Sequence, residues 1–287
     1  MRVGNNPPRR TVAGLAIFLL LSAYRGSSAA AEGQAFASAW SGDARSAMRL
    51  IAGSGSQRAN GFRRAGVEIR LNPGWHTYWR YPGDAGVPPQ FDFGDSVNIA
   101  AVHVLWPAPH RIPEHALSVI GYTSDVVLPL RVAPLRPDQP VKLHLKLDYA
   151  ICQNVCVPVQ AVAELELTEA ASEWDGALAG AEALVPMKRA LRDGQPPSIQ
   201  SVRRDASRSQ VVVDIAAPAG ARIDLFAEGP TPDWALPLPK PLAAPAAGVQ
   251  RFAFDLDGAP PGASYEGAIL TFTVAGEHPI EVSTALE

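Results

Sequence analysis

The chemistry of this chain centres on its two cysteines, Cys152 and Cys156, which have three residues between them. Two thiols at this spacing can exchange with another disulfide, bind a soft metal ion, or form a disulfide with each other. In the chain-entropy model, closing so short a ring stabilises a fold by only about 2 kcal/mol, against about 4.7 kcal/mol for a 100-residue loop. Short rings are also prone to strain, which makes the bond exchangeable. These arguments favour a redox-active pair over a structural disulfide, which stays open as the alternative.

Strictly alternating segments flank the cysteines and predict how they are held. Residues 141–148 alternate between apolar and polar side chains, and residues 157–167 alternate again over their second half. A period of two is typical of a half-buried strand. The two segments therefore predict a β-hairpin, with both thiols near an exposed tip that a partner can reach.

The N-terminal residues predict export. An Arg-Arg pair at 9–10 precedes an apolar run over 12–23, about a dozen residues and too short to span a bilayer. Small residues follow, and an A-x-A cleavage site ends at Ala31. We expect residues 1–31 to be a signal peptide, and the mature protein to be periplasmic without membrane insertion. That compartment is oxidising, so the two cysteines can form a disulfide there.

Composition narrows the class of protein. The formal charge of −3 becomes −7 once the four arginines of the signal peptide are removed, and no lysine or arginine block remains. A mildly acidic chain of this kind argues against nucleic acid as a partner. The 27 prolines and 24 glycines predict many short strands joined by turns rather than long helices.

We therefore predict an all-β fold, with two immunoglobulin-like β-sandwich domains joined by a short helical connector. The predicted boundaries are 45–170 for the first sandwich, 171–195 for the connector and 196–287 for the second sandwich. Ser172 is the expected cap of the connector helix. The strands are expected at 47–51, 66–71, 76–80, 97–105 and 126–132 before the cysteine hairpin, and at 210–215, 222–227, 250–256, 268–274 and 280–284 after it.

Other polar and aromatic residues offer weaker signals. Asp148 and Tyr149 are close to the cysteines in sequence and can influence the thiols. For Asp148, an equally good interpretation is a strand residue whose side chain faces solvent. Trp75, Tyr78 and Trp79 are expected mainly in the core. The histidines lack zinc spacing and are expected in loops or in solvent; they include His76, His103, His110, His115 and His144. No cofactor is predicted.

An ordered series of motifs resembles the N-terminal-domain family of DsbD, a thiol:disulfide interchange protein, particularly its ScsB-like branch. The resemblance covers about residues 45–170. The motifs are GWHTYW at 74–79, PGDAGVP at 82–88, WP at 106–107, GY at 121–122, LP at 128–129 and LDYAICQNVCVP at 147–158.

This resemblance implies an immunoglobulin-like periplasmic domain that takes electrons from a membrane thiol-disulfide carrier. It passes them to periplasmic thioredoxin-like proteins. Cys152 and Cys156 match the family's redox pair, and the resemblance implies that Cys156 attacks while Cys152 resolves. The family's cap loop matches residues 111–122, with His115 and Tyr122 as candidate supporting residues.

The sequence departs from the family pattern in two respects, the covering of the cysteines and the domains present. The best-known members space their cysteines more widely and cover them with an aromatic cap residue, whereas no aromatic precedes Tyr122 in the matching stretch. The chain also contains neither a transmembrane bundle nor a thioredoxin-like domain. We therefore expect it to work with separate proteins, as a component of a protein-disulfide reductase system if it is active.

Two other classes of function stay open. A Cu(I)-binding or copper-tolerance protein would use both thiolates, with His144 or His110 as a third ligand. Against this reading, the mature chain has only Met48 and Met187 and so no methionine-rich copper motif. A non-enzymatic interaction module would carry the disulfide for structure alone. The candidate pathways are cytochrome c maturation, disulfide repair and copper tolerance.

Overall fold

The computed structural model describes residues 36–54, 61–114, 117–168, 170–205, 207, 209–243 and 246–286, together with residues 1 and 4. The chain divides into two compact units, Met1–Gln34 and Ala35–Glu287, and every element below lies in the second. Apart from residues 1 and 4, the predicted signal peptide lies outside the described residues. No helix in the described part of the chain has the length and apolar content needed to cross a bilayer.

The described residues form an all-β fold with one short helix, as predicted. The first part holds β1 (Ser41–Gly42), β2 (Ser46–Ala52), β3 (Arg63–Leu71), β4 (His76–Gly83), β5 (Gln90–Asp92), β6 (Ile99–Val104), β7 (His110–Glu114), β8 (Leu117–Tyr122), β9 (Val126–Pro134), β10 (Val141–Cys152) and β11 (Cys156–Leu167). The second part holds α1 (Asp175–Ala183), β12 (Met187–Lys188), β13 (Ser198–Asp205), β14 (Gln210–Ala216), β15 (Asp224–Glu228), β16 (Lys240–Leu242), β17 (Val249–Asp255), β18 (Ile269–Ala275) and β19 (Ile280–Ala285).

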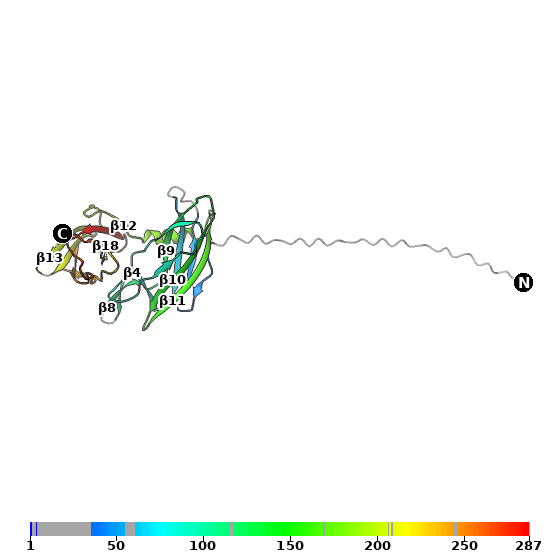
Figure 1. Ribbon diagram of the computed structural model, residues 1–287, viewed down its shortest axis with the longest axis horizontal. Coiled ribbons are helices and arrows are strands. Elements are labelled where there is room, and N and C mark those ends of the chain that lie inside the picture. The colour runs from blue at the N-terminus through cyan, green and yellow to red at the C-terminus, as the bar shows by residue number, and fades with distance from the viewer. Residues whose placement is uncertain are drawn as a thin grey trace. The chain divides into compact units, whose positions relative to one another are not determined.

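Two sheets of the first part enclose its apolar core. One sheet has the strand order β1-β2-β3-β9-β6, and the other has the order β11-β10-β4-β8-β7 with β5 also paired to β10 (Figure 1). Their facing side chains form one buried cluster that includes Leu50, Val67, Leu130, Leu143 and Leu165. This is the immunoglobulin-like arrangement that the strand spacing predicts.

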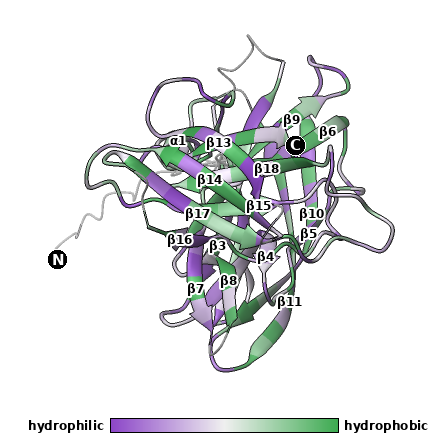
Figure 2. Ribbon diagram, turned by 90° about the vertical axis from the view of Figure 1, so that its left-hand side faces the viewer, coloured by the Kyte–Doolittle hydropathy of each residue, from purple (hydrophilic) through white to green (hydrophobic). Residues whose placement is uncertain are grey.

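The hairpin of β10 and β11 is the longest pairing in the described part of the chain and confirms the alternation argument. Its register runs from Val141 opposite Leu167 to Cys152 opposite Cys156. Apolar side chains of β10 are buried while the intervening lysines and Asp148 are exposed, and Figure 2 shows strands in which hydrophobic and hydrophilic segments alternate. The cysteines therefore end a rigid strand pair.

The segment predicted as a cap loop, residues 111–122, is instead a hairpin of β7 and β8. Ile112 lies opposite Val119, and Glu114 lies opposite Leu117. Strand β8 also pairs with β4, where a Cβ atom on Gly121 would lie 1.9 Å from the carbonyl oxygen of Thr77. Glycine at this position permits the close approach of the two strands. Pairing on both sides of β8 turns the expected loop into sheet.

The second part contains two further sheets, with the orders β12-β19-β18-β15 and β13-β14-β17-β16. They enclose a separate cluster of buried side chains. Within the predicted connector 171–195 only Asp175–Ala183 is helical, and Met187–Lys188 pairs with β19. Trp174, not Ser172, is the N-cap of the helix; the Ser172 hydroxyl accepts from the backbone N–H of Trp174 at 3.1 Å and donates to the carbonyl of Ala52. The predicted domain boundaries stay a prediction.

Specific contacts tie the two parts together. The ring of Trp79 on β4 packs against Phe226 on β15, with 6.1 Å between ring centroids. Arg111 on β7 forms a two-pronged ion pair with Asp224, with nitrogen–oxygen distances of 3.0 and 2.8 Å. The β7–β8 hairpin is thus held by β4 on one side and by Asp224 on the other.

Candidate functional site: a disulfide at the tip of a hairpin

Cys152 and Cys156 form a disulfide where β10 ends and β11 begins, with 4.1 Å between their Cα atoms. The two sulfurs differ in access. Cys152 is fully buried, whereas Cys156 is exposed. The expectation that both thiols sit on an exposed turn is therefore wrong for Cys152. Its side chain forms a small buried cluster with Ala150 of the same strand and with Tyr78 and Val119.

The hydroxyl of Tyr78 contacts both sulfurs. Its oxygen lies 2.7 Å from Cys152 Sγ and 3.3 Å from Cys156 Sγ. Burial raises the pKa of Tyr78 to about 12, and the charge of Glu114 adds to the effect. The phenol therefore keeps its proton at neutral pH and can donate a hydrogen bond to a thiolate. The absence of a side chain at Gly86 leaves room for the ring, since a Cβ there would lie 2.4 Å from the ring carbon Cε1.

His76 lies directly opposite Cys152 across the β4–β10 pairing. It is 6% exposed, and its ring stands edge-on to that of Tyr78 at 5.6 Å. Burial lowers the pKa of His76, and the nearby charge of Glu114 opposes this shift. The expectation of a histidine in a loop or in solvent is therefore wrong here, because the residue belongs to a central strand of its sheet.

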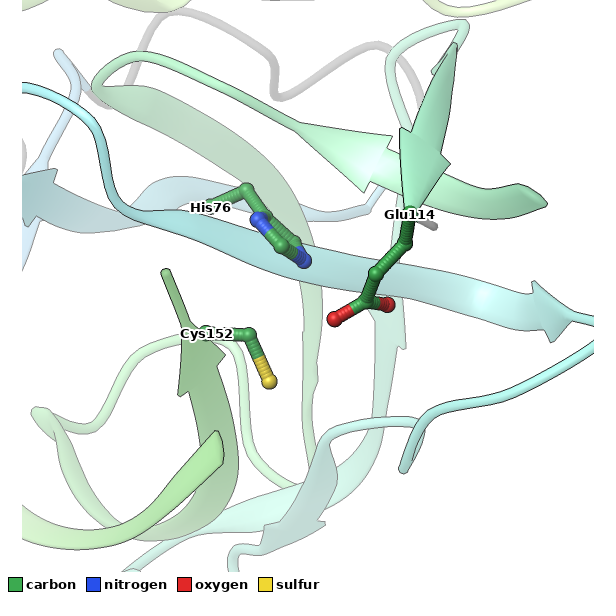
Figure 3. A group of neighbouring side chains, drawn as sticks. All are labelled: His76, Glu114 and Cys152. Carbon is green, nitrogen blue, oxygen red and sulfur yellow. The ribbon is translucent and has the colours of Figure 1, made fainter. Parts of the chain in front are cut away.

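Glu114 completes the polar group around the buried sulfur. A ligand atom of Glu114, one of His76 and Cys152 Sγ all lie within 4.8 Å of one another. Figure 3 shows the three side chains reaching toward a common point, with His76 from β4, Glu114 from β7 and Cys152 from β10. A cysteine beside an acid and an imidazole can exchange protons or hold a cation.

A groove runs past the exposed sulfur. It has a volume of about 490 Å³, and its lining includes Cys156, Tyr78, Val87 and Leu117. The apolar rim, which we define as Val87, Leu117 and Val155, is 57%, 50% and 69% exposed. Large apolar side chains left in solvent around a reactive group are typical of a protein-docking surface.

Of the other predicted site residues, the structure places one beside Cys156 and two in the core. Asp148 is exposed and lines a second groove together with Cys156. The hydroxyl of Tyr149 bonds to Ser46 Oγ at 2.8 Å, and the hydroxyl of Tyr122 donates to the Pro107 carbonyl at 2.8 Å. Both tyrosines therefore satisfy buried polar groups in the core. His115 lies outside the described residues.

The histidines considered as copper ligands are placed elsewhere. His144 lies on β10 beside Glu164 and Asp95, at 3.7 and 3.8 Å. His110 begins β7, opposite Gly121. Among the described residues, the fold brings His76 to the sulfurs, together with Tyr78 and Glu114, and sequence reasoning assigned none of these three to the site. Two signals were available: residues 76 and 78 share a strand face, and Glu114 lies within the segment 111–122 that resembles the family's cap loop.

Comparison with known proteins finds a family match over the part of the chain that carries the cysteines. Residues 51–168 match the family model described as the N-terminal domain of the thiol:disulfide interchange protein DsbD, and both cysteines lie within the match. No curated protein matches the chain.

Two solved structures are similar to different degrees. The N-terminal periplasmic domain of ScsB from Proteus mirabilis aligns over 88% of this chain and 98% of its own, with a TM-score of 0.68 and 23% identity. This match shows a shared fold. The periplasmic chaperone SfaE aligns over 79% of this chain and 94% of its own, but its TM-score of 0.19 and 7% identity carry no argument.

Proposed function

We propose that this chain, whose residues 51–168 match the DsbD N-terminal family, is a periplasmic thiol-disulfide exchange module. In this proposal Cys152 and Cys156 relay electrons from a membrane thiol-disulfide carrier to thioredoxin-like partners. One observation carries the proposal: one sulfur of the pair is exposed, the other is buried, and one tyrosine hydroxyl contacts both.

The difference in exposure supports the roles that we propose for the two cysteines. A nucleophilic thiol has to reach a partner's disulfide, and burial in apolar surroundings disfavours a thiolate. Cys156 therefore attacks and Cys152 resolves. This is the order that the family resemblance implies.

The exchange proceeds in two balanced steps. The Cys156 thiolate attacks one sulfur of the partner's disulfide, a mixed disulfide forms, and the partner's other sulfur leaves as a thiolate that takes up a proton. The Cys152 thiol then gives up its proton and attacks Cys156 Sγ, which releases the partner's second sulfur. Two electrons have then moved to the partner, and the Cys152–Cys156 disulfide is formed. A dithiol of the membrane carrier restores the reduced pair by the reverse sequence.

Tyr78 supports both steps. Its hydroxyl lies within hydrogen-bond distance of either sulfur, so it can donate to whichever one carries negative charge. A hydrogen bond to a charged group contributes about 1.5–3 kcal/mol. The same donor therefore serves the attacking thiolate and the thiolate that resolves the mixed disulfide.

The apolar rim supplies the docking surface in this proposal. Val87 and Leu117 line the groove that contains Cys156, and Val155 is part of the hairpin turn. A partner whose own disulfide lies in a shallow apolar surface can cover this rim and exclude water from the reacting sulfurs. Thioredoxin-like proteins are the class that the family resemblance implies.

A redox titration tests the proposal. The protein is equilibrated in a series of glutathione buffers, quenched, and scored for free thiols. An exchange module should titrate reversibly as a two-electron couple, whereas a structural disulfide should stay oxidised down to below about −300 mV. A disulfide that resists the entire glutathione series would refute the proposed function.

A further inference from the structure

Three potential metal ligands of different chemistry converge beside the disulfide. Cys152 offers a sulfur, His76 an imidazole nitrogen and Glu114 a carboxylate oxygen, and these atoms all lie within 4.8 Å of one another (Figure 3). They come from three strands of one sheet, β10, β4 and β7, with β8 between β4 and β7, so the sheet itself fixes their spacing. The exchange mechanism gives no role to His76 or Glu114.

His76 is one of six side chains in the described residues that carry a buried polar atom without a hydrogen-bond partner. Its Nε2 atom is fully buried and has no hydrogen-bond partner among the described residues. Buried polar atoms nearly always have a partner, and an exception calls for an explanation such as an ion. The orphaned nitrogen belongs to the residue directly opposite Cys152, so it points to a ligand at the sulfur.

Glu114 adds a charge without a counter-ion. It is half-buried, and no lysine or arginine forms an ion pair with it in the part of the chain that the structure describes. Reduction of the disulfide creates two groups beside it that can each become negative. A divalent cation would offset this concentration of negative charge.

We propose that the reduced pair, together with His76 and Glu114, binds a divalent metal ion of the zinc class. Thiolate, imidazole and carboxylate are the three ligand types that zinc takes in proteins, usually four at a time in a tetrahedron. Cys156 supplies the fourth donor, because the disulfide already places its sulfur next to Cys152 Sγ. A groove of about 340 Å³ lined by His76, Glu114, Thr123 and Gln153 gives the ion a path to the site.

The chemistry balances without any partner protein. A dithiol delivers two electrons and two protons to the disulfide and becomes a disulfide itself. The metal then displaces the thiol protons with no further change of oxidation state. The inference goes beyond the exchange function, since it requires only that the disulfide can be reduced. The bound ion would hold both sulfurs, so it would keep the pair reduced and block attack on a disulfide until it is removed.

Cobalt(II) provides the test, because it occupies zinc sites and reports thiolate ligation and tetrahedral geometry in its absorption spectrum. The purified protein is reduced with dithiothreitol, freed of reductant without oxygen, and titrated with Co²⁺. Sulfur-to-cobalt charge transfer and intense ligand-field bands should develop to one equivalent, and Zn²⁺ should abolish them. The oxidised protein should give neither band. A reduced protein with no such spectrum, or an oxidised protein with the same spectrum, would overturn the proposal.

Substitutions distinguish a four-donor metal site from metal binding by the two thiols alone. His76→Gln and Glu114→Gln should each weaken Co²⁺ binding by at least roughly 100-fold, since groups that only support a ligand already cost 10- to 100-fold. The matched controls His110→Gln and Glu164→Gln lie outside the cluster and should bind like wild type. If His76→Gln fails to fold, as judged from the melt of its oxidised form, the half-buried Glu114→Gln decides the question. Unchanged affinity in the folded variants would show that the thiols alone bind the ion and would refute the four-donor site.

Discussion

Replacing Tyr78 with phenylalanine removes one atom, the hydroxyl oxygen that lies 2.7 Å from Cys152 Sγ and 3.3 Å from Cys156 Sγ. The ring stays, so the packing against Gly86 is retained. In the oxidised protein the substitution should cost little stability, because a disulfide sulfur is a weak hydrogen-bond acceptor. In the reduced protein the attacking thiolate loses its hydrogen-bond donor. The variant should therefore fold normally and react slowly.

The magnitude follows from the lost hydrogen bond. A bond to a charged group contributes about 1.5–3 kcal/mol, which corresponds to a shift of roughly 1–2 in the pH at which the thiolate forms. The thiolate population at neutral pH then falls by roughly 10- to 100-fold, but the more basic thiolate is also more nucleophilic, with a Brønsted coefficient of about 0.4–0.5. The net expectation is that exchange becomes roughly 3- to 16-fold slower. The reduction potential should fall by roughly 30–60 mV wherever the thiolate is populated.

The assay is the rate of alkylation of the reduced protein as a function of pH. For Tyr78→Phe the midpoint of this profile should move up by roughly 1–2 pH units. Tyr149→Phe is the matched control, because its buried hydroxyl bonds to Ser46 Oγ instead of to a sulfur. A Tyr78→Phe profile that coincides with wild type would refute the assigned role. An equal shift in Tyr149→Phe would do the same.

Three further predictions concern stability. Reduction of Cys152–Cys156 should lower the free energy of unfolding by less than about 3 kcal/mol, because the ring is short; a larger loss in paired melts would favour a structural disulfide. Arg111→Ala and Asp224→Ala should show a coupling energy of about 1–2 kcal/mol in a double-mutant cycle of denaturant melts, because their two-pronged ion pair is half-buried; additive effects would contradict this. The hydrogen bond from Arg251 lowers the pKa of Asp214 in the folded protein. The pair therefore stabilises the fold fully at a pH above 3.8, the ordinary pKa of the carboxyl, and this stabilisation is lost as the pH falls through the lower pKa of the folded state. The melting temperatures of wild type and Asp214→Asn should therefore differ most at neutral pH and converge in acid; a constant difference would count against the ion pair.

Much of the fold was predictable because apolar and polar side chains alternate along many of the strands. Residues 141–148 and 157–167 predict a hairpin, and the structure pairs them as β10 and β11. Strand β7 gave no such signal, since Pro113 cannot donate to a ladder and the segment carries His110, Arg111 and Glu114. It is a strand because β8 pairs with it, and β8 is itself held by β4, a partner far away in the sequence that leaves no mark on the local pattern.

The site was predictable only in part. The cysteine pair was evident from its spacing, but its environment depends on the pairing of β4 with β10. That register places His76 opposite Cys152 and brings the Tyr78 hydroxyl to the sulfurs. Tyr149 was predicted to support the cysteines because it is close to them in sequence. Successive residues of a strand face opposite sides of the sheet, and the hydroxyl of Tyr149 reaches the core instead.

The measurement that tests the central claim most directly is the trapping of single-cysteine variants. Reduced Cys152→Ala and Cys156→Ala proteins are each mixed with an oxidised thioredoxin-like protein, and mixed disulfides are quantified by mass spectrometry. Because Cys156 is exposed and Cys152 is buried, Cys152→Ala should accumulate a mixed disulfide, whereas Cys156→Ala should accumulate almost none. Equal trapping by both variants would contradict the assigned roles, and no trapping by either would contradict thiol-disulfide exchange with this class of partner.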